Sequence, residues 1–268
     1  VFTDRPFLGN PVAVVLDGIG LDEGAMAAFS RWTNLSEATY VGEPTHPRAD
    51  YSLRIFCAER ELPFAGHPTL GSCHAWLAAG GQPKADVIVQ ECGAGLVRIR
   101  RQGALLSFAA PDLLRSGPLD DTDVALLARG LGIDVADIVA HHWCDNGPPW
   151  HAVLLRDAEA VRSVRPDATV LAGRFVGVVG LPTETGEAYV EVRAFAPGNG
   201  SVFEDPVTGS LNAALAQWLI GSGRLPDTYT AAQGTVLGRA GRVHVERIGA
   251  DIWIGGHCTT VIDGTALI

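Results

Sequence analysis

The sequence predicts an α+β fold of two related lobes, in each of which a curled, mostly antiparallel sheet surrounds one central helix. A block that begins at His67 returns without a gap 138 residues later at Asp205, which indicates two related halves. Each copy runs through a proline into an alanine-rich segment with little polar face, a pattern typical of a buried helix. Many short runs with the composition of strands surround both segments.

The repeated block also predicts where a ligand binds. His67-Pro-Thr-Leu-Gly-Ser-Cys-His-Ala-Trp-Leu77 aligns with Asp205-Pro-Val-Thr-Gly-Ser-Leu-Asn-Ala-Ala-Leu215. Proline suits the first helical position because it lacks the N–H that would be unpaired there, so His67 and Asp205 are the predicted N-caps. Unpaired N–H groups at a helix start favour a carboxylate or another anion. We therefore expect the active site in the cleft between the lobes, with both helix starts facing it.

The first lobe is expected to comprise residues 1–111 and about 257–268. Its opening residues have the pattern of a strand whose start is absent, and Thr259–Ile268 is expected to add a further strand at that edge. Asn34 stands where a left-handed residue would end a helix. Apolar spacing predicts helices at Leu21–Thr33 and about Pro68–Ala79, and strands at Val12–Leu16, Thr39–Val41, Tyr51–Phe56, Val87–Gln90, Gly95–Arg100 and Ala104–Ala109.

The second lobe is expected to comprise residues 112–256, after a proline-rich linker at 111–118. A hairpin through Thr185-Gly186 joins two of its strands, and a glycine-rich loop at 197–205 leads into the second repeated helix. The predicted helices are Asp121–Arg129, Ala158–Ser163 and about Pro206–Ile220, and the predicted strands are Ile138–Trp143, Ala152–Leu155, Arg174–Leu181, Ala188–Phe195, Thr228–Leu237, Arg242–Glu246 and Ile252–Ile254.

Composition limits the classes of function. The chain is 47% hydrophobic and 19% charged with a net charge of −10, which fits a compact protein and argues against nucleic-acid binding. No apolar run is long enough to span a membrane, so a cytoplasmic protein is expected. Five cysteines without a Cys-x-x-Cys pair indicate neither disulfides nor a zinc site. Gly198 and Gly200 lack the spacing of a nucleotide-binding loop, and no cofactor is expected.

Four residues are candidates for chemistry, although each also has a structural interpretation. Glu37 lies in a polar connector, where a carboxylate can simply be solvated. His67 is an unusual N-cap, because imidazole caps helices poorly. Asp205 is a good structural cap, and the hydroxyl of Ser210 could bond a backbone carbonyl. His74, Cys73 and the pair His141-His142 have no ligand-like partners at a suitable spacing and are expected to be packing or surface residues.

Longer motifs carry a family resemblance. The motifs are Val1-Phe-Thr-Asp-Arg-Pro-Phe-x-Gly-Asn-Pro11, Asn34-Leu-Ser-Glu-x-Thr39, Glu61-Leu-Pro-Phe-Ala-Gly-His-Pro-Thr-Leu-Gly71 and Glu204-Asp-Pro-x-Thr-Gly-Ser210. Through them the chain resembles the phenazine-biosynthesis (PhzF-like) isomerases from its first residue to its last. That resemblance implies the diaminopimelate epimerase-like fold, with two lobes and the active site between them.

The resemblance implies roles for these residues. It makes Glu37 the acid–base group, with His67 and Asp205 as further catalytic residues. The chemistry implied is a cofactor-independent isomerisation of a dihydro-hydroxyanthranilate-like carboxylate, in which one carboxyl group moves a proton between ring carbons. A homodimer is also expected, from the family and from a mean hydropathy of +0.18. Within the same motifs, the expected substrate-binding residues are Ser210, Gly66, Gly209 and Thr208.

Two alternatives stay open. The first is an epimerase or racemase of a small amino acid, although related racemases carry cysteines at the positions of Ala65 and roughly Asp205. The second is a non-catalytic protein that binds a small carboxylate. A binder has no use for a second acid facing an anion, so the presence of both Glu37 and Asp205 favours an enzyme. After Ser210 the chain departs from the usual small residues of phenazine enzymes, and the substrate is left open.

Overall fold

The computed structural model describes residues 1–58, 60–181, 188–198 and 200–268. The chain forms two compact units, Val1–Ala109 with Gly255–Ile268 and Ala110–Ile254. The sequence had placed both limits two residues later. The hairpin expected at Thr185-Gly186 lies outside the described residues.

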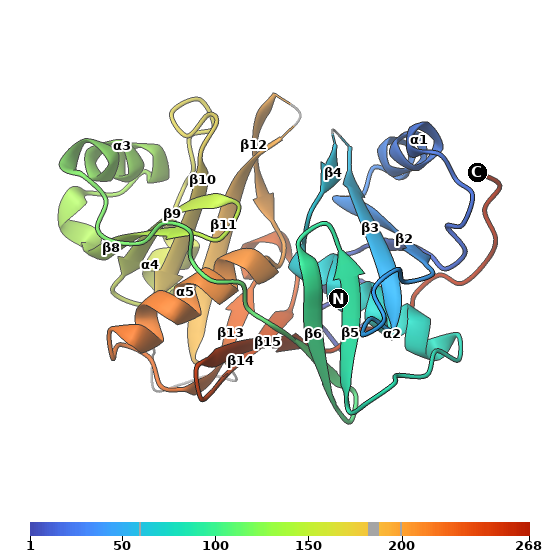
Figure 1. The fold of residues 1–268 in the computed structure, drawn as a ribbon. Helices are drawn as coiled ribbons and strands as arrows, with labels where there is room; N and C mark the ends of the chain where they lie inside the picture. The colour runs from blue at the N-terminus through green and yellow to red at the C-terminus, as the bar shows by residue number, and fades with distance from the viewer. Residues whose placement is uncertain (59, 182–187, 199) are drawn as a thin grey trace. The chain divides into compact units, whose positions relative to one another are not determined.

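The sheet of the first unit curls around helix α2 (Gly66–Ala78) (Figure 1). Its strands follow the order β1-β2-β3-β5-β6-β7, and β4 pairs with β3. Only β1–β2 and β3–β5 are parallel among the pairs within the described part of this unit. Helix α2 contacts β1 and β2 at one end of this order and β7 at the other. The strands are β1 (Ala13–Val15), β2 (Glu37–Gly42), β3 (Tyr51–Cys57), β4 (Glu61–Leu62), β5 (Val87–Cys92), β6 (Gly95–Gln102) and β7 (Leu105–Ala109).

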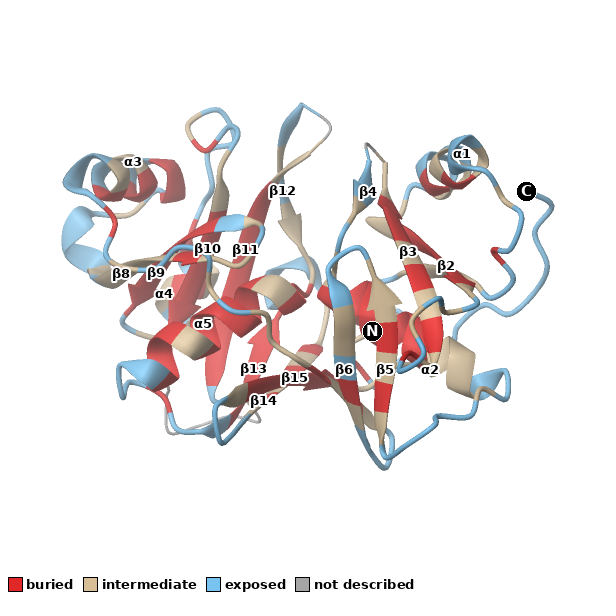
Figure 2. Ribbon diagram, in the orientation of Figure 1, coloured by how far each residue is buried: buried red, intermediate tan, exposed pale blue. Residues whose placement is uncertain are grey.

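Close packing and buried hydrogen bonds fix α2. A Cβ on Gly71 would lie 2.6 Å from Cγ1 of Val12, so the glycine lets the helix approach the chain just before β1. The hydroxyls of Thr39 on β2 and Ser72 lie 2.8 Å apart. The first eight residues of α2 are buried, as Figure 2 shows for the helix inside the first unit. The prediction of a buried helix here is confirmed.

Helix α1 (Glu23–Thr33) covers the other face of β2 and β3. It starts at Asp22, whose carboxylate accepts a hydrogen bond from the Ala25 N–H at 2.8 Å, and it ends at Asn34 with φ 55°. The left-handed Asn34 predicted from the sequence is confirmed. Met26 of this helix packs with Tyr40 and Phe56 in a small apolar core.

The second unit repeats this plan around helix α5 (Gly209–Gly221). Its strands follow the order β15-β14-β13-β11-β10-β9-β8, and β12 pairs with β11. Helix α5 is almost wholly buried and contacts β8 near one end of this order and β14 near the other. The strands are β8 (Ile138–Asp145), β9 (Pro149–Leu155), β10 (Phe175–Gly180), β11 (Val190–Gly198), β12 (Ser201–Asp205), β13 (Thr228–Gln233), β14 (Gly241–Ile248) and β15 (Asp251–Gly256).

Helices α3 (Asp121–Leu131) and α4 (Ala158–Ser163) belong to an apolar core separate from α5. Leu127 and Val161 from these helices pack with Val178 of β10 and Phe195 of β11 in this core. The bounds predicted for α4 are confirmed. The curled sheet around one buried helix, present in each unit, confirms the predicted α+β class.

Several predicted elements were wrong. Thr259–Ile268 is not a strand, and its Asp263-Gly264 pair is of a type depleted in strands. The expected loop at 197–205 instead contains the end of β11 and β12, which pair antiparallel. The strand predicted to reach Leu237 ends at Gln233, because Gly234 has φ 87° and a short 3₁₀ turn follows.

Candidate functional site

The two central helices begin differently from the outer ones. In the described chain, α1, α3 and α4 each have an aspartate N-cap whose carboxylate accepts a backbone N–H at 2.8 Å, namely Asp22, Asp120 and Asp157. The N-caps of α2 and α5 are Ala65 and Thr208, and neither makes a side-chain cap hydrogen bond. The first N–H groups of these two helices therefore lack both an intrahelical acceptor and a capping side chain.

The predicted N-caps His67 and Asp205 were wrong. Helix α2 starts one residue before His67, and Pro68 is its third residue, a position whose missing N–H costs no hydrogen bond. Asp205 is the last residue of β12, and α5 starts four residues later. The helices begin 143 residues apart, not 138, so His67 and Ser210 each occupy the second position of a central helix.

Glu37 and His67 form a close pair in the first unit. Oε2 of Glu37 lies 3.1 Å from Nε2 of His67, and the side chains are only 15% and 7% exposed. Both atoms are buried, and neither is in hydrogen-bonding geometry with any group of the described chain, including the other. Glu37 is the first residue of β2, so its assignment to a polar connector was wrong. The fold thus brings an acid and an imidazole together with uncommitted polar atoms.

The strand β2 explains why Glu37 faces α2. Side chains alternate along a strand, and Thr39, two residues further, reaches Ser72 of α2 with its hydroxyl. Tyr40 lies on the opposite face, where its hydroxyl donates to the Met26 carbonyl of α1 at 2.7 Å. The odd-numbered residues of β2 therefore face the central helix and place the Glu37 carboxylate at its start.

In the second unit, Asp205 is held by the residues that precede α5. The Thr208 hydroxyl donates to Oδ2 of Asp205 at 2.5 Å and accepts from Nε2 of Gln233 at 2.8 Å. Oε1 of Gln233 accepts the Thr208 N–H at 3.0 Å, and its Nε2 also donates to the Asp205 carbonyl at 3.0 Å. The hydroxyl of Thr208 is thus used to hold Asp205.

Ser210 is held by residues of β9 and of the turn before it. Its hydroxyl oxygen accepts the indole N–H of Trp150 at 3.2 Å, which leaves the hydroxyl hydrogen available to donate. Its carbonyl accepts from Nδ2 of Asn146 at 2.9 Å. Gly209, before it, is the first residue of α5. Ser210 can therefore offer a donor beside the N–H groups of the helix start.

Three residues that contact the predicted site were missed from the sequence. Gln233 ends β13, while Asn146 and Trp150 flank the turn between β8 and β9. All three lie far along the chain from the repeated block and carry no motif spacing of their own. Asn146 stands in the run Asn-Gly-Pro-Pro, which signals a turn but no ligand.

The residues for which the sequence predicted packing or surface roles are Cys73, His74, His141 and His142. Burial raises the pKa of the Cys73 thiol to about 12, which fits an inert core cysteine. His74 approaches Thr260 at 3.0 Å, and the rings of His142 and Trp218 stack with centroids 5.1 Å apart. Nδ1 of His141 accepts the Leu119 N–H at 3.1 Å. These contacts agree with the structural interpretation.

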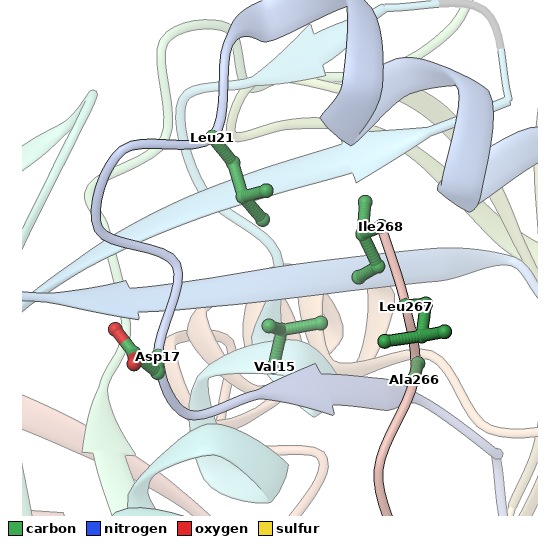
Figure 3. Close-up of a pocket in the computed structure, with 6 residues that line it drawn as sticks. All are labelled: Val15, Asp17, Leu21, Ala266, Leu267 and Ile268. Atoms are coloured by element: carbon green, nitrogen blue, oxygen red, sulfur yellow. The ribbon is translucent and has the colours of Figure 1, made fainter.

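A pocket of about 460 Å³ in the first unit has neither Glu37 nor His67 in its lining (Figure 3). Val15, Leu21 and residues 266–268 line it, together with Asp17. Because the lining side chains are apolar apart from Asp17, it offers little acid–base chemistry, and the Glu37–His67 pair is the better candidate site. Within the described residues, no group of three or more His, Cys, Asp or Glu could hold a metal ion. No helix among the same residues has the length and hydropathy to cross a membrane.

Comparison with known proteins places the chain in a family. Residues 1–264 match the PhzC-PhzF family model, described as phenazine biosynthesis-like protein. "Antisense-enhancing sequence 1" of Schizosaccharomyces pombe is 35% identical, over the whole of this chain and 97% of the relative. Trans-2,3-dihydro-3-hydroxyanthranilate isomerase of Pseudomonas aeruginosa is 31% identical, over 93% of this chain and 88% of the relative.

Solved structures agree on the fold. A PhzF-family protein of Bacillus anthracis superposes with a TM-score of 0.80 at 21% identity, over 96% of this chain and 93% of that chain. A probable proline racemase of Agrobacterium radiobacter gives a TM-score of 0.56 at 14% identity, over 92% of this chain and 82% of that one. The match to the family model over almost the whole sequence, together with relatives named as isomerases, identifies the chain as an isomerase of the phenazine biosynthesis-like (PhzC-PhzF) family.

Proposed function

We propose that the protein is a cofactor-independent isomerase that moves a proton between carbons of a small cyclic amino or hydroxy carboxylate. The substrate class follows the isomerases that the chain is similar to, whose printed substrate is trans-2,3-dihydro-3-hydroxyanthranilate. The observation that supports this proposal most is the buried pair of Glu37 and His67, whose Oε2 and Nε2 atoms lie 3.1 Å apart and have no hydrogen-bond partner in the described chain.

In this proposal Glu37 carries the proton. As a carboxylate it takes a proton from a substrate carbon, the electron pair of that C–H bond shifts into the neighbouring π system, and the carboxylic acid then returns the proton to another carbon. Native structures rarely leave buried polar atoms without partners, so the uncommitted Oε2 of Glu37 supports a role toward a ligand. His67 stabilises the negative charge that develops on the substrate as the proton leaves.

Each central helix start offers binding groups of its own. The N–H group of Gly66 in the first unit, and the N–H group of Gly209 with the hydroxyl of Ser210 in the second, are donors that suit a carboxylate. Asp205, which Thr208 holds in place, is a second carboxyl group of the proposed chemistry. Thr208 acts in this scheme through Asp205 and is a positioning residue.

The alternative functions lack a supporting observation of this kind. In the related racemases the two thiols take the positions of Ala65 and roughly Asp205, neither of which is a cysteine here. Cys73 and Cys144 are fully buried, and burial raises the pKa of each thiol to about 12. A protein that only binds a carboxylate gains nothing from burying Glu37 beside His67.

We further propose that the protein is a homodimer. Light scattering at micromolar concentration tests this, and a monomeric mass would reject it.

The function can be tested with a single substrate. Trans-2,3-dihydro-3-hydroxyanthranilate is incubated with the native protein and with Glu37→Gln, and the reaction is followed by NMR. We expect the native protein to isomerise the compound and the variant to be at least about 100-fold slower, because the amide cannot accept the proton. No conversion by the native protein of this compound or of related cyclic amino carboxylates would reject the proposed function.

A further inference from the structure

Asn146, in the turn between β8 and β9, has one half of its amide uncommitted. Its Nδ2 donates to the Ser210 carbonyl at 2.9 Å. Its Oδ1 is buried and has no hydrogen-bond partner within the described residues. The contact with Ser210 fixes the orientation of the amide, because a carbonyl can only accept and so must face the NH₂ group. The oxygen is therefore the half left without a partner.

No side chain of the described residues donates to this oxygen. Ser210 accepts the indole N–H of Trp150 through its hydroxyl oxygen. The side-chain NH₂ of Asn212 donates to the Thr208 carbonyl at 2.9 Å and to Oε1 of Gln233 at 2.8 Å. That of Gln233 donates to Asp205 and Thr208. A buried acceptor without a donor is costly, so an acceptor held in this state beside a helix start favours a role toward a ligand.

We propose that Oδ1 of Asn146 accepts a hydrogen bond from an amino group that the substrate carries next to its carboxylate. The proposal rests on the proposed function, in which the start of α5 and the Ser210 hydroxyl hold that carboxylate. Asn146 is tied to the Ser210 carbonyl, which places its side chain against the first turn of α5. An amide oxygen can only accept hydrogen bonds. This position therefore selects a ligand group that donates a hydrogen bond and disfavours a second carboxylate.

This assignment makes Asn146 a residue that determines specificity. A buried, unpaired acceptor favours a ligand that carries the matching donor, because that ligand pairs the acceptor whereas a ligand without the donor leaves it unpaired. The substrate class narrows accordingly from small carboxylates in general to carboxylates with an adjacent amino group.

Two ligands that differ only in that amino group test the proposal. The dissociation constants of 3-hydroxyanthranilate and 3-hydroxybenzoate are measured by calorimetry for the native protein and its variants. We expect the native protein to prefer 3-hydroxyanthranilate by roughly tenfold or more. Asn146→Ala should reduce this ratio to near one.

Gln217→Ala is the matched control. Gln217 of α5 also donates its amide to a backbone carbonyl, that of Pro111 at 2.7 Å, so its loss removes a similar bond. The ratio should be unchanged in this variant. Thermal unfolding verifies that each variant folds, and Asn146→Leu, of similar volume, replaces Asn146→Ala if the latter does not.

Two results would overturn the proposal: equal affinity of the native protein for both ligands, or a preference that persists in Asn146→Ala and Asn146→Leu. Failure of the proposed function is a separate result. If the native protein isomerises its substrate while the ratio does not depend on Asn146, only the present inference fails. If the ratio depends on Asn146 and no isomerisation is found, the inference stands and the function does not.

Discussion

Arg193 and Glu204 form a two-bond ion pair between β11 and β12. Nε of Arg193 donates to Oε1 of Glu204 at 2.9 Å and Nη2 donates to Oε2 at 2.7 Å. Both side chains are nearly buried. The remaining Nη1 donates to the carbonyls of Val161 and Val164 around the end of α4. Because Glu204 directly precedes Asp205, this pair fixes the strand that carries a candidate catalytic acid.

Removing one partner of this pair should destabilise the second unit. In Glu204→Ala the buried guanidinium loses its counter-charge, and breaking such a pair typically costs about 3–5 kcal/mol of unfolding free energy. Urea denaturation measures the loss. Glu61→Ala is the control, because Glu61 pairs with Arg54 in a more exposed position and should cost about 1 kcal/mol or less. Equal effects of the two changes would contradict this interpretation of the buried pair.

Acid should weaken the contact between the linker and β8. Burial, and to a smaller extent the neighbouring His141, lowers the pKa of His142 below its ordinary value. Its neutral ring accepts the Gly117 N–H through Nε2 at 2.9 Å. In the unfolded chain His142 has its ordinary pKa and is protonated more readily than in the folded protein. The contribution of its neutral ring to the free energy of unfolding is therefore fully present above the ordinary histidine pKa and falls as the pH drops through about 6.5.

The dependence can be measured from unfolding curves between pH 5 and 8 for the native protein and His142→Gln. Glutamine keeps an acceptor but does not titrate, so the decline toward acid should become shallower. It should not vanish, because burial also lowers the pKa of His74 and His151. An identical pH slope in both proteins would show that His142 does not contribute.

Isomerisation should need no added metal or nucleotide. A carboxyl group that acts first as base and then as acid needs no electron sink beyond the substrate's own π system. Turnover after exhaustive dialysis against EDTA should stay within about twofold of the untreated enzyme, as chemistry carried by side chains alone requires. Loss of turnover that one particular metal restores would contradict this expectation.

The sequence predicted the central elements well where local chemistry decides. The bounds of α4 and the left-handed Asn34 follow from apolar spacing and from the conformational freedom of asparagine. The two buried helices follow from alanine-rich segments without a polar face. The motif resemblance identified the residues Glu37 and His67, which the fold then brings to 3.1 Å.

Tertiary contacts decided what the sequence could not predict. The start of α5 depends on Gln233, a strand residue that binds the Thr208 N–H and so keeps residues 206–208 out of the helix. The gapless repeat aligned Asp205 with His67, but the helix starts align Ser210 with His67. The contact of Asn146 with Ser210 joins residues 64 apart and leaves no trace in local spacing.

Ser210→Ala should separate binding from chemistry. The change removes one hydrogen-bond donor to the substrate carboxylate. It therefore weakens the binding of the substrate and of the transition state to a similar extent. We expect KM to rise about tenfold while kcat changes less than about threefold. A fall in kcat of more than about 100-fold at unchanged KM would instead place Ser210 in the proton transfer.

The central claim is that Glu37 carries the proton, and the most direct measurement is turnover of Glu37→Gln in deuterium oxide. We expect kcat to fall by about 10²–10⁴, or about 3–5 kcal/mol of barrier, while 3-hydroxyanthranilate still binds. Native enzyme and the control Glu43→Gln, an exposed glutamate just after β2, should place deuterium on the product carbon at equal rates. Near-native turnover and deuterium incorporation by Glu37→Gln would contradict the assignment and move the base to His67 or Asp205.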